Sequence, residues 1–273
     1  MTLSEYYGFP KGINAQMRYA SFYTEQDDDY PCPANMNNAF AYQTMTFIKP
    51  LNTSNVTNMS YMFNSCPKLT TAPLMDTSNV TSMVSMFYSC SELTDVPSYN
   101  TSNVTTMEDM FNYCKKLTTI SPLDTSKVTN MDSMFYSCDY LITIPPLDTS
   151  NVTTMNQMFY SCPKLTTIPP LNCSKISSKN YYPVYSYNNY TYLTEVGGFI
   201  NMKMSWDNTY GLAKCPNLTY ESCINILNGL YDFTGNSQTP NSSQGKLKVH
   251  ANFLTTVGDE LSIGTEKGWT ITT

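Results

Sequence analysis

The chain has 273 residues, a net charge of −6 and a pI near 4.7. This acidic composition gives no sign of the basic surface that nucleic-acid binding needs. No apolar run is long enough to span a bilayer. Only 13% of the residues are charged, so a chain of this length must cover a sizeable core with a mostly uncharged polar surface.

The N-terminal part of the chain precedes any regular pattern. Residues 1–35 predict an N-terminal cap or an irregular segment. They show no basic stretch followed by an apolar one, so we expect no secretory leader. Glycine is absent between Gly12 and Gly197, which indicates turns built from Asn, Asp, Ser, Thr and Pro and a backbone that does not depend on positive φ.

A 24-residue repeat occupies the middle of the chain. Five copies in residues 51–171 keep Val, Leu, Met, Phe and Cys in register, a degenerate copy precedes them, and the repeat region runs over 36–176. One copy cannot bury its apolar face alone, so the copies must stack. The sequence predicts an α/β repeat solenoid whose core columns include Met59, Phe63, Cys66, Phe87, Cys90, Phe111, Cys114, Phe135, Cys138, Phe159 and Cys162.

Each copy predicts a turn, a short helix and a short strand. Met155, Met158, Phe159 and Cys162 recur at i, i+3, i+4 and i+7, which is typical of one helical face. The strand is expected in the β-branched, proline-stopped segment after Leu165. Helix N-caps are expected at the threonine after each valine, which is Thr57, Thr81, Thr105, Thr129 or Thr153.

The repeat resembles a known class. The pattern C-x-x-L-T-x-[IV]-P-x-x-[DN]-T-S-[NK]-V-T-x-M-x-x-M-F-x-x-C over about residues 51–176 resembles the BspA-like leucine-rich repeat. The closing segment of the chain is similar to the terminal cap of such proteins from gut bacteria and their phages. The resemblance implies a leucine-rich-repeat stack and a surface-exposed binding or adhesion protein.

The register fails after Ile176, and residues 177–213 are predicted as a tyrosine-rich insertion. Tyrosine interleaved with Ser and Asn is typical of contact surfaces, which makes these residues candidates for ligand binding. The alternative is that they cover the flank of the last coils. The candidate ligand-binding residues are Tyr181, Tyr182, Tyr185, Tyr187, Tyr190 and Tyr192.

Residues 214–273 predict a longer αβ coil that closes the stack. Thr219 is expected to cap one helix, Asn252 to begin a second, and Lys246–Val249 to form an outer strand. Lysines on that strand would protect the edge from pairing with another chain.

The cysteine column indicates packing by buried thiols rather than disulfides or a metal site, because five equivalent thiols point the same way. His250 is the only histidine, and a pair with Cys223 stays open as a remote catalytic alternative. The aspartates at 76, 124 and 148 are interpreted as turn formers rather than calcium ligands. We therefore expect no enzyme activity, no metal and no cofactor.

The expected function is non-catalytic recognition or adhesion, with a protein or polysaccharide on a cell surface as the partner. The alternative is a structural or receptor-binding component of a phage virion, such as a tail or fibre. In both cases we expect no nucleic acid, no membrane insertion and possible assembly into a larger particle. The expected location is the cell surface, the extracellular space or the virion.

Overall fold

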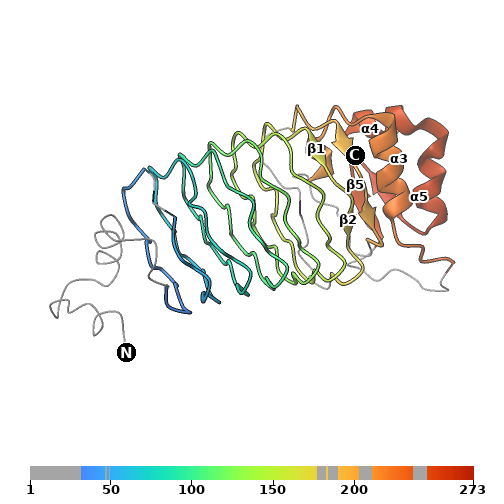
Figure 1. Ribbon diagram of the computed structural model, residues 1–273. Coiled ribbons are helices and arrows are strands. Elements are labelled where there is room, and N and C mark those ends of the chain that lie inside the picture. The colour runs from blue at the N-terminus through green and yellow to red at the C-terminus, as the bar shows by residue number, and fades with distance from the viewer. Residues whose placement is uncertain are drawn as a thin grey trace, which may run out of the picture.

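The protein is a single stack of coils closed by helices at its C-terminal end (Figure 1). The computed structural model describes residues 32–46, 48, 50–176, 183, 190–202, 211–235 and 245–273. No helix in these ranges is long and apolar enough to cross a membrane. Equivalent residues of neighbouring coils face each other, so most of the architecture follows from a single coil.

The coils stack in parallel with the register of the repeat. Isolated parallel bridges join Asn58 to Ser82, Ser82 to Thr106, Thr106 to Asn130 and Asn130 to Thr154, each 24 residues apart. A further bridge joins Asn35 to Asn58, so the degenerate first copy belongs to the stack. The predicted repeat stack is therefore confirmed.

The predicted strand of each coil is at most two residues long in the structure. Within the array only β1 (Thr167–Ile168) and β2 (Leu171–Asn172) have two residues, and they pair in parallel with β3 (Glu195–Val196) and β4 (Phe199–Ile200). At the equivalent positions of earlier coils, single bridges join Leu51 to Met75 and Thr71 to Asp95.

The predicted helix of each coil is wrong, because this segment is a run of turns. In residues 59–66 the N–H of Phe63 donates to the carbonyl of Met86 in the next coil at 2.9 Å. Tyr61 and Ser65 take positive φ values of 58° and 56°. The same left-handed backbone recurs at Ser85, Ser89, Asp109, Tyr113, Ser133, Ser137, Gln157 and Ser161.

The left-handed residues explain why a helical sequence pattern does not give a helix. Each costs about 1–2 kcal/mol for a residue with a Cβ. In return, alternate N–H groups point at the next coil, where they meet carbonyls over the whole segment. The inference that a glycine-free region needs no positive φ is therefore wrong, since serine and other L-residues supply it here.

The threonines predicted as N-caps have a different role. The hydroxyl of Thr105 donates to the carbonyl of Thr81 at 3.1 Å, and that of Thr129 donates to the carbonyl of Thr105 at 3.1 Å. These side chains join neighbouring coils instead of capping a helix.

The core consists of columns of identical side chains. Phenylalanine rings from Phe40 to Phe159 stack in sequence with centroid separations of 5.4–5.8 Å. All eleven residues predicted for the core columns are 0% exposed. Packing of like on like sets the distance between coils at the phenylalanine column.

The cysteine column consists of buried thiols, and none of its five members forms a disulfide. The thiol of Cys114 donates to the carbonyl of Phe87 at 3.1 Å, and Cys90, Cys138 and Cys162 make the equivalent bond. Burial raises the pKa of Cys66 to about 11, so these side chains act as small apolar groups with one weak donor.

Residues 190–202 form a further coil, so the predicted insertion 177–213 is wrong over this part. Thr194 N–H donates to the Thr166 carbonyl and Gly197 N–H to the Ile168 carbonyl, at 3.1 and 2.9 Å. The hydroxyl of Tyr190 donates to the carbonyl of Phe159. This is the position at which a cysteine thiol donates in the preceding coils, so Tyr190 replaces the cysteine of its column.

The cap is built from local helices. Helix α3 (Tyr220–Gly229) lies against β3 and β4 and begins at Thr219, whose Oγ1 accepts from Ser222 N–H at 3.3 Å, as predicted. Lys267 Nζ donates to three carbonyls at the other end of α3, at 2.8–3.3 Å. The other elements are η1 (Leu212–Lys214), β5 (Lys246–Lys248), α4 (Ala251–Val257), η2 (Gly258–Leu261), α5 (Ser262–Glu266) and β6 (Thr270–Thr272), and β5 pairs in parallel with β6.

Candidate functional site

The most regular exposed surface lies directly after the buried leucine column of the repeat. Leu165 and Ile168 are buried, so the two residues between them point outward in each coil. We call this surface the threonine face. It consists of Thr70, Thr71, Thr94, Asp95, Thr118, Thr119, Ile142, Thr143, Thr166, Thr167, Thr194 and Glu195.

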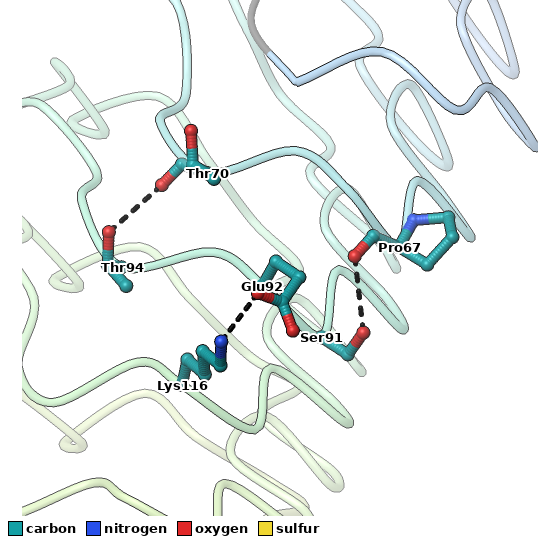
Figure 2. A network of polar contacts seen from close by, with 6 residues as sticks. All are labelled: Pro67, Thr70, Ser91, Glu92, Thr94 and Lys116. Atoms are coloured by element: carbon teal, nitrogen blue, oxygen red, sulfur yellow. Dashed lines mark hydrogen bonds and ion pairs between the residues drawn. The ribbon is translucent and has the colours of Figure 1, made fainter.

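The hydroxyls of Thr70, Thr94 and Thr166 on this face donate to backbone carbonyls of the preceding coil. Thr94 Oγ1 donates to the carbonyl of Thr70 at 3.2 Å (Figure 2), and Thr166 Oγ1 donates to that of Ile142 at 3.0 Å. These hydroxyls keep their lone pairs for a ligand but use their proton within the protein. At these three positions the face therefore presents acceptors to a ligand.

A second line of side chains runs beside the threonine face, one residue before each leucine. We call it the variable column, because its members change from coil to coil while the buried columns repeat. Its members are Lys68, Glu92, Lys116, Tyr140, Lys164 and Tyr192.

Neighbours in the variable column interact. Lys116 Nζ lies 2.6 Å from Glu92 Oε2 (Figure 2). Lys164 Nζ lies 5.5 Å from the ring centre of Tyr140 and 5.6 Å from that of Tyr192, so it sits over two aromatic rings. Exposed pairs of both kinds contribute about 1 kcal/mol or less to stability. The column thus gives the surface a specific pattern of charge and aromatic area at little benefit to folding.

A recess opens at the N-terminal end of this column. It has a volume of about 460 Å³ and is lined by Thr46, Pro67, Lys68, Thr70 and Glu92. Both charge signs are present on its wall, and polar contacts across neighbouring coils hold the wall in place (Figure 2).

The structure places the predicted tyrosine residues in different environments. Tyr190 is 1% exposed and belongs to the core, so its assignment to ligand binding is wrong. Tyr192 is 55% exposed and lies in the variable column. The other candidates, Tyr181, Tyr182, Tyr185 and Tyr187, lie outside the described residues.

A tyrosine ladder on another surface was not predicted. Tyr88, Tyr113, Tyr136 and Tyr160 lie on successive coils with ring centres 6.0, 5.5 and 4.2 Å apart. Desolvation, then the neighbouring Tyr160, raises the pKa of Tyr136. The only signal in the sequence is a tyrosine one or two residues after the phenylalanine in four successive copies.

Acidic side chains gather on the turn segments of two coils. Desolvation, together with the charges of Asp109 and Asp132, raises the pKa of Glu108, and desolvation also raises that of Asp109. Asn130 Nδ2 donates to Glu108 Oε2 at 3.0 Å. Among the described residues no group of three or more His, Cys, Asp or Glu side chains could hold a metal ion.

The remaining candidates have structural roles. His250 is the N-cap of α4, and its Nδ1 accepts from Asn252 N–H at 3.1 Å, so the helix begins at Ala251, one residue earlier than predicted. The aspartates at 76, 124 and 148 accept from the backbone N–H two residues on, as expected of turn formers. That hydrogen bonding, from serine in each case, lowers their pKa values.

The fold and these surfaces define a repeat protein of stacked 24-residue coils with an αβ cap. The family model described as "Mycoplasma protein of unknown function, DUF285" matches residues 34–142 and 114–186, more than half of the chain. The protein belongs to this family. The more specific BspA-like assignment stays a prediction.

Two further comparisons give little. No curated protein matches the chain. A solved leucine-rich repeat protein from Bacteroides ovatus is similar at 16% identity with a TM-score of 0.30. That match covers 71% of this chain and 59% of the other, which is less than two thirds of its length. At such a TM-score the similarity carries no argument about function.

Proposed function

We propose that the protein is a non-catalytic recognition protein that binds a protein or glycan on a cell surface. The binding surface is the threonine face together with the variable column. In this proposal the protein acts at a cell surface, in the extracellular space or on a virion, without nucleic acid and without insertion into a membrane. The BspA-like pattern of the repeat supports the same class of function.

The variable column is the observation that carries the proposal. Its side chains are cationic, anionic or aromatic, whereas the buried Val, Met, Phe, Cys and Leu columns each repeat one residue through the five regular copies. Exposed ion pairs and cation–π contacts add little to stability, so folding does not require this variation. Tyrosine and charged groups on a rigid scaffold are what a specific contact surface needs.

A second form of the proposal is a receptor-binding component of a phage virion. The nine buried cysteines of the chain, none of them in a disulfide, favour this form, because proteins made and assembled in a reducing cytosol, as a phage component would be, keep their thiols reduced. Such a component would also bind a cell surface, so the two forms share the binding site and differ in assembly.

The test is binding of the purified chain to a panel of whole bacteria and immobilised surface polysaccharides. The variant Tyr140→Ser/Lys164→Ser/Tyr192→Ser removes the aromatic and cationic end of the variable column. We expect saturable binding by the parent chain and at least a tenfold loss in the variant, since contacts at the centre of an interface are worth about 2 kcal/mol or more.

The matched control is Tyr42→Ser/Tyr61→Ser. Both tyrosines are exposed and lie outside the threonine face and the variable column. Both have positive φ, which serine also adopts in this chain. Equal loss in the control, or no binding by the parent chain, would contradict the proposal. Sedimentation of the purified chain would then show whether it forms the larger assembly expected of a virion part.

A further inference from the structure

A second recess lies where the last coils meet the cap. It has a volume of about 460 Å³ and is open to solvent on one side. Ile144, Ile168 and Val196 from three successive coils form an apolar floor. Glu195 of β3 and Glu221 in the first turn of α3 stand at its rim, and both residues are exposed.

The two carboxylates have no cation of their own in the described part of the chain. The ion pairs found there join Lys115 to Asp139 and Lys116 to Glu92, both outside the recess. Among the described residues, no lysine or arginine lines the recess. An apolar floor below two uncompensated negative charges is complementary to a group with an apolar stem and a positive end.

Lysine and arginine side chains have this form. They bury an aliphatic stem along apolar surface while the charged head stays near water. A carboxylate that accepts from such a head forms a charge-assisted hydrogen bond, which is about twice as strong as a neutral one. We infer that this recess binds a lysine or arginine side chain of a protein partner.

This inference deepens the proposed function and rests on it, because it makes the partner a protein. The recess continues the threonine face, since Thr167 and Glu195 belong to both. A partner lying along that face would therefore reach the recess with one basic side chain. The described residues that line the recess include no aromatic ring, so they offer no flat platform for a sugar ring.

The experiment measures binding of capped lysine (Nα-acetyl-L-lysine N-methylamide) to the full chain by ligand-observed NMR. Capped norleucine, which has a similar stem and no charge, is the matched probe. We expect a Kd on the order of 1 mM for capped lysine, as for a good ligand of this size. Capped norleucine should bind at least about tenfold more weakly, because it forms no charge-assisted hydrogen bond.

The protein variant is Glu195→Gln/Glu221→Gln, with Asp259→Asn as its control. Asp259 is an exposed carboxylate of η2 and lies outside the recess, the threonine face and the variable column. Binding of capped lysine should weaken at least about tenfold in the double variant and stay unchanged in the control. If the double variant melts at a lower temperature than the parent chain, the comparison of the two probes on the parent chain decides.

Equal binding of capped lysine and capped norleucine to the parent chain would overturn the inference. Glucosamine serves as a cationic sugar probe, and tighter binding of glucosamine than of capped lysine would also overturn it. Capped lysine binds independently of any cell, so the outcomes of the two proposals can be separated. If the parent chain binds cells but does not bind capped lysine, this inference alone is overturned. Lysine binding by a chain that binds no cell in the panel would overturn the proposed cell-surface function and leave the recess assigned.

Discussion

The array and the cap solve the same problem, which is how to satisfy backbone groups, in opposite ways. In the array, alternate N–H groups of the turn segments donate to the next coil. In the cap, α3 satisfies its own backbone, with Thr219 at one end and Lys267 at the other. A coil is therefore stable only beside its neighbours, whereas α3 is a local structure docked on the last coil.

The contrast shows in one residue type. Thr105 and Thr219 both follow an apolar residue and both precede a segment with helical spacing. Thr105 donates to the preceding coil, and Thr219 accepts from its own helix. The neighbouring coil decides which of the two roles the hydroxyl takes.

The largest effect is expected from breaking the phenylalanine column. Phe111 stacks on Phe87 and Phe135 with ring centres 5.8 and 5.7 Å apart. Phe111→Ala leaves a cavity between both neighbours and should lower the free energy of unfolding by about 3–5 kcal/mol. Urea-induced unfolding followed by far-UV circular dichroism measures it.

Trp269 lies in the cap and gives a second probe of the same transition by its fluorescence. If the stack is cooperative, the fluorescence midpoint should shift together with the dichroism midpoint. Phe111→Leu, which keeps much of the volume, should cost less than the alanine variant. A loss below about 1 kcal/mol for Phe111→Ala would contradict the nearest-neighbour account.

A smaller effect is expected where the two regions meet. Tyr190 is buried, and its hydroxyl is the donor for the carbonyl of Phe159. Tyr190→Phe leaves that carbonyl without this donor and should cost about 1–3 kcal/mol in unfolding free energy. Tyr192→Phe, two residues on and 55% exposed, should stay within about 0.5 kcal/mol. Chemical denaturation of the pair measures both, and equal effects would show that Tyr190 does not act as the cysteine of its coil.

The sequence was sufficient to predict the stack, because its columns are a property of one-dimensional spacing. Met155, Met158, Phe159 and Cys162 are all buried, as their helical spacing predicts. The spacing says nothing about the backbone that produces this burial. Alternate N–H groups, such as that of Phe159, which donates to the carbonyl of Pro183 at 2.7 Å, find their partners 23 or 24 residues further on, and no local pattern contains such a partner.

The site was harder to predict for the same reason. Tyr190 and Tyr192 stand in one tyrosine-rich run, yet one occupies a core column and the other an exposed one. The register of this coil is shifted, since Tyr190 follows Cys162 by 28 residues instead of 24. Aligning Leu193 with Leu165 would have placed both tyrosines from the sequence.

The smallest effect separates the two threonine roles. Thr219→Ala removes the N-cap of α3 and should cost about 1 kcal/mol in unfolding free energy, whereas Thr105→Ala removes one exposed hydroxyl bond and should cost less than about 0.5 kcal/mol. Urea denaturation measures both, and Thr219→Ser should restore most of the loss, because serine also caps a helix. If Thr105→Ala were the more costly change, the hydroxyl bonds between coils would be a major source of stability for the array. The left-handed turns would then be maintained by side chains as well as by the backbone.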